Sequence, residues 1–148
     1  MSIPSFGTKV EKVEYKERDG VHIVISRNNE SEIVLIQAPN GSYFLPGGEI
    51  EAGETHEDCI KRELIEELGF SAVIGDYYGQ ADEYYYSSHR KTYFYNPAFI
   101  YGAKSWQKIG EPTEKTNGIE WFPVDTAIKK LKRGSHKWGV EQWKKAQA

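Results

Sequence analysis

The chain has 148 residues with 39% hydrophobic and 28% charged side chains, which is the composition of a folded domain rather than a disordered one. A net charge of −3 argues against a dedicated nucleic-acid-binding protein, because such proteins usually carry a strongly basic surface. The single cysteine, Cys59, excludes an intramolecular disulfide and a cysteine-rich zinc site, and it favours a reducing compartment. The sequence contains no run of about 18 apolar residues, so we expect no membrane span. Residues 1–9 lack the apolar stretch of a signal peptide. We therefore expect one cytoplasmic domain over residues 1–148.

The first half of the chain predicts short strands and turns. Residues 21–26 and 32–37 are rich in β-branched residues and predict two strands, and the polar residues 27–31 between them predict a hairpin. After a turn, the short apolar run 43–45 is followed by residues 46–48, whose proline and glycines are expected to break regular structure.

Residues 55–68 predict a helix. Thr55 is suited to cap its first turn, with Asp58 at the capping-box distance, and Gly69 suits the position just past its end.

Beyond this helix, residues 71–78 lead into an aromatic-rich stretch in which residues 92–101 predict a strand, with Pro97 at a bulge or an edge position. Residues 119–123 predict a further short strand.

Two helices are expected at the end of the chain. Asp125 is expected to cap a helix over residues 126–132, and a last helix is expected over residues 137–145. Strands and helices mix without regular alternation, which favours a mixed α/β sandwich over a doubly wound sheet.

An unusual concentration of acidic residues marks the predicted central helix. Residues 49–67 contain eight acidic side chains and two basic ones. On an ideal helix Glu63, Glu66 and Glu67 share one arc of roughly 100°, beside the apolar stripe that would pack on a sheet. Such neighbours repel one another, and they lie in the half of the helix where the dipole disfavours negative charge. The arc is therefore either a solvated surface or a site for a divalent cation such as Mg²⁺.

The segment from Gly48 to Phe70 reads GEIEAGETHEDCIKRELIEELGF. It resembles the Nudix box, G-x5-E-x7-R-E-U-x-E-E-x-G-U, in which U is a bulky apolar residue. Every fixed position of the box is filled, without a gap, by Gly48, Glu54, Arg62, Glu63, Leu64, Glu66, Glu67, Gly69 and Phe70. A match at so many positions is far more specific than a lone glycine-rich loop.

The resemblance implies a fold and an activity. The fold is an α/β/α sandwich with a mixed β-sheet, in which the box forms a loop–helix–loop. The activity is hydrolysis of a pyrophosphate bond in a nucleoside diphosphate linked to another moiety, with Mg²⁺ or Mn²⁺ as cofactor. By the same resemblance Glu66 and Glu67 are metal ligands, Glu63 is a ligand or the general base, and the carbonyl group of Gly47 is a further ligand.

The resemblance gives supporting roles to two more residues of the box. Arg62 would orient a carboxylate, and Glu54 would brace the loop. For Arg62 the alternative is an ordinary surface ion pair of a helix, with Asp58 four residues before it or Glu66 four residues after it.

Signals for substrate binding outside the box are weaker. Tyr85 or Tyr86 could stack on a purine base, although ordinary sheet packing is the alternative for both. Arg90 could contact phosphate groups, although it could equally lie in a solvated turn. A further acidic residue outside the box often assists catalysis in this family, and the candidates are Glu83, Glu111, Glu114 and Glu120.

The function expected from the sequence is therefore that of a metal-dependent Nudix hydrolase with a small nucleotide as its substrate. Two alternatives remain open. One is a Nudix module that senses a nucleotide without cleaving it, and the other is an RNA 5′-end pyrophosphohydrolase. Nucleic acid and membrane partners are not expected, and the family resemblance is compatible with a homodimer.

Overall fold

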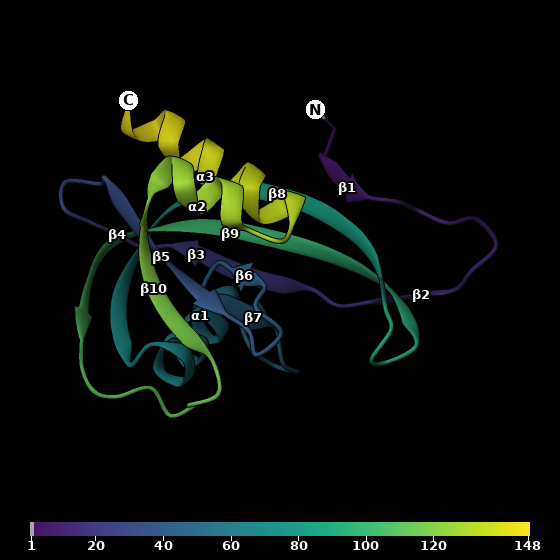
Figure 1. Cartoon of the computed structure of the whole chain (residues 1–148), viewed down its shortest axis with the longest axis horizontal. Helices are drawn as coiled ribbons and strands as arrows, with labels where there is room; N and C mark the ends of the chain where they lie inside the picture. Colours follow the sequence, from purple (N-terminus) through teal and green to yellow (C-terminus); the bar gives the residue numbers. More distant parts are fainter. Residues whose placement is uncertain (1) are drawn as a thin grey trace.

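The computed structural model describes residues 2–148, and its largest element is a mixed β-sheet (Figure 1). The strands of this sheet follow the order β1-β8-β9-β3-β7, and β2 also pairs with β9. Their bounds are β1 Ser5–Gly7, β2 Tyr15–Glu17, β3 Gly20–Val24, β7 Gly47–Glu49, β8 Phe70–Ser87 and β9 Thr92–Lys108. The strands β8 and β9 form a long antiparallel ribbon, whereas β3 and β2 run parallel to β9.

A smaller antiparallel sheet has the order β10-β5-β4, and β6 also pairs with β5. Its strands are β4 Ser26–Arg27, β5 Glu32–Gln37, β6 Tyr43–Phe44 and β10 Gly118–Pro123. The expected hairpin is present, but the single strand expected over residues 21–26 is wrong. The chain changes sheets at Ile25, so that β3 joins the large sheet and only β4 pairs with β5 in the hairpin.

Helices cover both sides of the sheets, which confirms the expected α/β/α sandwich (Figure 1). The helix α1 (His56–Glu67) packs on one side, and the helices α2 (Val124–Lys130) and α3 (Gly134–Gln147) pack on the other. The strand β5 supplies both cores, because Ile33 and Leu35 face α2 and α3 whereas Val34 and Ile36 face α1. All four side chains are buried, as expected for a strand covered on both faces.

The helix α1 begins and ends as its sequence predicts. The Thr55 hydroxyl accepts a hydrogen bond from the Asp58 amide at 3.1 Å, and the Asp58 carboxylate accepts one from the Thr55 amide at 3.2 Å. This capping box satisfies two backbone donors that the first turn leaves free. Gly69, with a φ of 70°, follows the last turn in the left-handed conformation that glycine adopts without strain.

Pro97 does not lie at a bulge, but one of its sides faces no paired strand, so the expected edge position is correct for that side alone. On one side it pairs in regular register with Asp82 of β8. On its other side β9 changes partner, from β2 at residues 93–95 to β3 at residues 98–102. A proline is tolerated there because no neighbouring strand requires a hydrogen bond from its nitrogen.

Three other expectations need correction. Residues 46–48 do not wholly interrupt regular structure, because Gly47 and Gly48 pair with β3 as part of β7. Asp125 does not cap α2, because the helix spans Val124–Lys130 rather than residues 126–132 and Asp125 lies inside its first turn. No side chain caps this helix, and the Asp125 carboxylate instead accepts a hydrogen bond from Lys144 at 2.8 Å. The last helix spans Gly134–Gln147, so it is longer at both ends than the expected residues 137–145; Gly134 and Ser135 are poor helix formers and gave no local signal for the earlier start.

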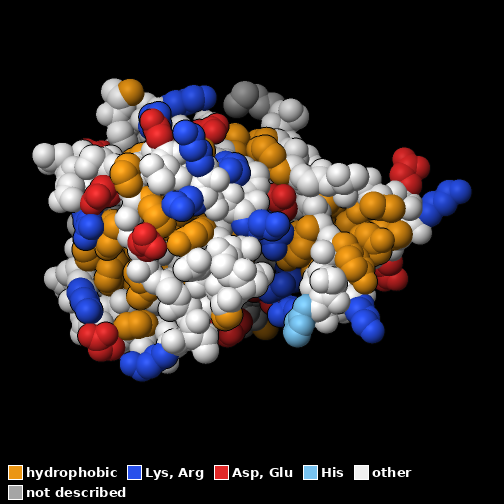
Figure 2. All heavy atoms as spheres, in the orientation of Figure 1, with side chains coloured by type: hydrophobic (Ala, Val, Ile, Leu, Met, Phe, Trp, Pro, Cys, Tyr) orange, Lys and Arg blue, Asp and Glu red, His pale blue; other side chains and the backbone are white. Residues whose placement is uncertain are grey.

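The tip of the β8–β9 ribbon carries a cluster of tyrosines, and an apolar patch covers this end of the molecule in Figure 2. The cluster consists of Tyr15, Tyr84, Tyr86, Tyr93 and Tyr95. Elsewhere on the face shown, acidic and basic side chains are interspersed. The tyrosine pairs stabilise the ribbon where it extends beyond the two cores.

We predict that Leu64→Ala lowers the free energy of unfolding by about 2–5 kcal/mol, because Leu64 is only 1% exposed in the core beneath α1 and its truncation leaves a cavity. The neighbouring Ile65 is 45% exposed, so Ile65→Ala is expected to change the free energy by less than about 1 kcal/mol. Urea unfolding monitored by circular dichroism checks both values. Equal effects for the two variants would contradict the placement of this helix.

Candidate functional site

A cavity of about 230 Å³ opens between the large sheet and the ends of two helices. Its walls come from β3, β7, β8 and β9, from Glu67 at the end of α1, and from His136 near the start of α3. Segments far apart in the sequence therefore meet here, and the acidic arc of α1 lies at one side of the cavity.

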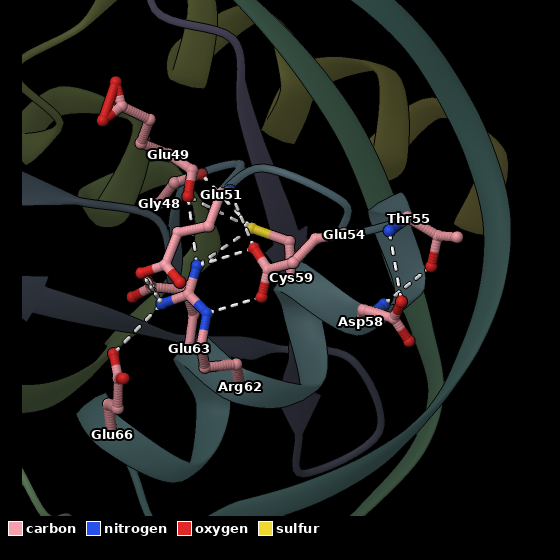
Figure 3. A network of polar contacts seen from close by, with 10 residues as sticks. All are labelled: Gly48, Glu49, Glu51, Glu54, Thr55, Asp58, Cys59, Arg62, Glu63 and Glu66. Carbon is pink, nitrogen blue, oxygen red and sulfur yellow. Dashed lines mark hydrogen bonds and ion pairs between the residues drawn. The ribbon is translucent and has the colours of Figure 1, made fainter.

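The Arg62 guanidinium is the centre of the polar network between α1 and the loop before it (Figure 3). Its Nε and Nη2 donate to the two carboxylate oxygens of Glu54 at 2.6 and 2.9 Å. A further hydrogen bond of 3.1 Å joins Nη2 to the carbonyl oxygen of Glu49. The two hydrogen bonds from Arg62 hold the pKa of the Glu54 carboxyl down to about 2, because they favour its charged form.

Arg62 also contacts the acidic residues of its own helix. Its Nη1 donates to Glu63 Oε1 at 2.8 Å and to Glu66 Oε2 at 3.3 Å. The pair with Glu66 is the helical ion pair that the sequence allowed, but the contact with Glu54 is shorter and less exposed. The expected helical ion pair with Asp58 is not formed, since that carboxylate is used in the cap of α1.

Glu63 packs directly over the backbone of Gly48. A Cβ atom added to Gly48 would lie 2.5 Å from Glu63 Oε1, so a larger residue would displace the carboxylate. Burial raises the pKa of Glu63 to about 7, and Arg62 opposes only part of this shift. Glycine is therefore favoured at this position of the box, because a larger side chain would collide with the Glu63 carboxylate.

Glu67 points back toward the loop, where its Oε1 accepts a hydrogen bond from the Gly47 amide at 2.9 Å. Burial raises the pKa of Glu67 well above its usual value, and the charges of Glu63, Glu114 and Glu66 raise it further. Negative charge is therefore concentrated around Glu67 with too little positive charge to balance it.

Of the four acidic candidates outside the box, only Glu114 acts electrostatically on the box carboxylates, since it raises the pKa of both Glu63 and Glu67. Its backbone amide donates to the Glu66 carbonyl oxygen at 2.8 Å, which fixes the loop beside α1. Glu83 instead accepts a hydrogen bond from the Ser135 amide at 3.0 Å. Glu111 contacts Lys108 and Glu120 contacts Tyr43 on the surface.

The residues expected to bind substrate are separated by the pleat of β8. Tyr85 lines the cavity, whereas its neighbour Tyr86 is 50% exposed and packs against Tyr93 in the ribbon cluster. Arg90 is exposed in the turn after β8, with its guanidinium 5.9 Å from the centre of the Phe94 ring. The cavity lining therefore includes Tyr85 but neither Tyr86 nor Arg90.

Several cavity residues were not found from the sequence, because they stand alone on separate elements and belong to no motif. They are Arg18, His22, Phe44, Asn96, Arg133 and His136.

The rings of His22 and His136 lie 4.1 Å apart at the back of the cavity. Burial lowers the pKa of both imidazoles, to about 4 for His22, so both rings are neutral near pH 7. His136 Nδ1 accepts a hydrogen bond from the Leu45 amide, and His22 Nδ1 donates to the Leu45 carbonyl oxygen.

In residues 2–148, no three His, Cys, Asp or Glu side chains converge as a complete set of metal ligands. The contacts of Arg62 explain this arrangement, because they turn Glu63 and Glu66 toward the guanidinium. The donors near Glu67 are nevertheless carboxylate oxygens, which are the ligands that Mg²⁺ prefers, and their mutual repulsion would be relieved by a divalent cation. The chemistry of this donor set fits such an ion.

Comparison with known proteins agrees with this geometry, since residues 16–143 match the family model of the NUDIX domain. The chain belongs to the Nudix family. A similar protein, the 8-oxo-dGTP diphosphatase of Haemophilus influenzae, is 36% identical over 106 residues, which cover 68% of this chain and 71% of that protein. An NAD-capped RNA hydrolase, NudC of Vibrio parahaemolyticus, is 42% identical over 60 residues, but these cover 38% of this chain and 23% of that protein.

A solved structure shares the fold over most of this Nudix chain. The MutT NUDIX hydrolase of Burkholderia pseudomallei superposes with a TM-score of 0.63 at 26% identity, and the match covers 86% of this chain and 98% of that one. Together with the family match, these relatives make the chain a Nudix pyrophosphohydrolase, of a family that generally uses divalent metal ions. Within residues 2–148, no helix is both long enough and apolar enough to cross a membrane.

We predict that Glu63→Gln reduces the pH dependence of stability between about pH 5 and 7. The folded state keeps the Glu63 proton up to a pKa of about 7, whereas the unfolded state releases it near 4.5, so this group lowers the free energy of unfolding as the pH rises between these values. The variant lacks this loss and should gain up to about 3 kcal/mol over the wild type by pH 7. Urea unfolding in EDTA over this pH range measures the difference.

The control is Glu57→Gln, on the exposed face of the same helix, which should keep the slope of the wild type. An unchanged slope in Glu63→Gln would contradict the buried environment of this carboxylate.

Proposed function

We propose that this Nudix protein is a metal-dependent hydrolase that cleaves a pyrophosphate bond in a nucleoside diphosphate linked to another moiety. The supporting observation is the cluster of Glu63, Glu66, Glu67 and Glu114, whose charges raise the pKa of Glu67 beside a cavity that also contains arginines. A polyphosphate would be repelled by these carboxylates alone, whereas both would bind a shared divalent cation. The charge pattern therefore fits a metal–polyphosphate substrate.

Mg²⁺ or Mn²⁺ would be held by the carboxylates of Glu63, Glu66 and Glu67 together with the carbonyl oxygen of Gly47. When bound, the ion neutralises charge on the phosphates and lowers the pKa of a water molecule. The hydrogen bond from Gly47 to Glu67 supports this role, because it holds the loop and the end of α1 together. Glu114 is the candidate for the additional acidic residue.

Glu63 is suited to accept the proton of the attacking water. Its pKa of about 7 places it close to the range in which a general base works at neutral pH. Arg62 has the role of orienting this carboxylate, and Glu54 has the role of holding Arg62 and the loop in place. In this proposal the ion pairs of Arg62 with Glu63 and Glu66 loosen when a cation binds, whereas the contact with Glu54 remains.

The proposal also includes a class of substrate. The similarity to the 8-oxo-dGTP diphosphatase extends over two thirds of the chain, which favours a nucleoside triphosphate over the other nucleotide classes. The similarity to NudC covers a short segment, so hydrolysis of RNA 5′ ends is the second candidate. Retention of the box carboxylates disfavours a sensor without activity.

We also infer that residues 1–148 act as a single Nudix domain in the cytoplasm, since the only cysteine is buried and free. Burial raises the pKa of the Cys59 thiol to about 12, which makes it an inert packing residue rather than a nucleophile. A homodimer is compatible with this proposal.

We predict that Glu67→Gln lowers kcat by at least about 100-fold while the protein stays folded, because the amide keeps an acceptor for Gly47 but loses the negative charge. The measurement is product analysis on ADP-ribose, diadenosine polyphosphates, nucleotide sugars, and normal and oxidised nucleoside triphosphates, each with Mg²⁺ and with Mn²⁺. Glu57→Gln is the matched control and should keep the activity of the wild type.

Cleavage of one substrate class that disappears in Glu67→Gln would support the enzyme and name its substrate. If the wild type binds nucleotides but cleaves none of them, the protein is a nucleotide sensor rather than a hydrolase. Capped and triphosphorylated RNAs are tested in parallel, and the RNA 5′-end candidate is lost if they stay intact.

A further inference from the structure

Arg133 is a cavity residue whose guanidinium lies against aromatic rings. It precedes α3, and its guanidinium carbon lies 3.6 Å from the centre of the Tyr85 ring and 5.7 Å from that of Phe44. Burial lowers the pKa of Arg133, and the charge of Arg18 across the cavity lowers it further. The side chain thus lies in a poorly solvated place that disfavours an unpaired cation.

The other cations of the site are paired, which makes Arg133 exceptional. Arg18 contacts Glu49 at 2.9 Å and Arg62 contacts Glu54 at 2.6 Å. For Arg133, no carboxylate oxygen of residues 2–148 lies within the 4.0 Å that defines an ion pair. The acidic residue that faces it, Glu83, is engaged by the backbone amide of Ser135 at the start of α3. The guanidinium donors that Tyr85 does not use are therefore available to a ligand.

Asn96 adds an acceptor to the same cavity. Its amide nitrogen donates to the carbonyl oxygens of Arg18 and Pro97, which fixes the orientation of the side chain and leaves Oδ1 without a donor from the protein. The cavity lining therefore presents a guanidinium fork and a separate amide oxygen to whatever enters.

We propose that Arg133 is a specificity-determining residue that binds a pair of adjacent hydrogen-bond acceptors on the part of the substrate remote from the cleaved phosphates. This proposal rests on the proposed function, because it assumes that the cleaved phosphates lie at Glu67 and that the rest of the substrate extends into the cavity. The planar fork of a guanidinium matches two neighbouring acceptors, and these have two sources in a nucleotide. They are the O6 and N7 atoms of a guanine ring, or two oxygens of a further phosphate.

The proposal changes the role of Tyr85. The guanidinium of Arg133 covers its ring, so this face is not available to a stacking base. Tyr85 is instead a positioning residue, since its cation–π contact holds the guanidinium in the cavity. The Tyr85 ring and Arg133 therefore act as one unit, which recognises hydrogen-bond acceptors of the substrate instead of stacking on its base.

Binding in EDTA tests the proposal without any need for turnover. Isothermal titration calorimetry measures the dissociation constants of GMP, AMP and inorganic phosphate for the wild type, Arg133→Met, Arg133→Lys and Lys132→Met. We expect Arg133→Met to weaken at least one of these ligands by about 10-fold or more. Arg133→Lys should weaken a ligand that needs the fork nearly as much, because lysine keeps the charge but not the geometry. Lys132→Met, an exposed neighbour, should bind like the wild type.

The pattern of losses identifies the acceptors. Loss of GMP binding alone indicates the guanine edge, whereas equal losses for GMP, AMP and phosphate indicate oxyanion binding. The proposal is overturned if Arg133→Met binds all three ligands as the wild type does, or if the wild type binds none of them at millimolar concentration. Thermal unfolding of each variant shows that it is folded.

Two substitutions of Tyr85 test its positioning role. Tyr85→Phe keeps the ring but loses the hydroxyl that hydrogen-bonds to Arg133, so it should keep most of the binding, whereas Tyr85→Leu should reproduce much of the loss seen in Arg133→Met. Wild-type binding by Tyr85→Leu would overturn the positioning role. If the wild type hydrolyses none of the nucleotides, the proposed function is lost but these binding results stand, so the two failures are distinguishable.

Discussion

The two-point contact between Arg62 and Glu54 is the constraint on which the site depends. It joins a residue in the middle of α1 to a residue of the loop that precedes the helix, so the loop cannot move independently of the helix. The same guanidinium reaches the carboxylates of Glu63 and Glu66. The Arg62 guanidinium therefore holds the loop, the helix and the carboxylates in a single arrangement. Its hydrogen bonds compensate for part of the repulsion among the acidic side chains.

This arrangement needs a rigid foundation, which the sheets supply. The strand β5 is buried on both faces, and α1 packs against β3, β7 and β8 through its apolar stripe. Because the core beneath α1 is closely packed, the acidic arc is held at the side of the cavity rather than in open solvent. The elevated pKa of Glu63 follows from that position, since the carboxylate is half enclosed by protein and cannot be fully hydrated.

The sequence predicted those parts of the protein that depend on neighbours in the chain. The Nudix box identified α1, its Thr55 cap and Gly69 at its end, because helix periodicity, capping and turn chemistry are all local properties. The cavity residues Arg133 and Asn96 could not be predicted, since each comes from an isolated position that only the topology brings near Glu67. Tyr85 was found as a candidate for stacking on a base or for ordinary sheet packing, but its contact with Arg133 was not found, because Arg133 lies far away in the sequence.

Pro97 shows how the backbone determines where the cavity opens. This residue has no amide hydrogen, and it lies where β9 changes partner from β2 to β3. The Asn96 amide fastens the chain between β2 and β3 by donating to the Arg18 carbonyl oxygen. Arg18, Gly20 and Asn96, which lie at this change of partner, are all part of the cavity lining. A protein built in this way can exchange the residues that line its binding site while the frame around them stays the same, so new substrate preferences can evolve without loss of the fold.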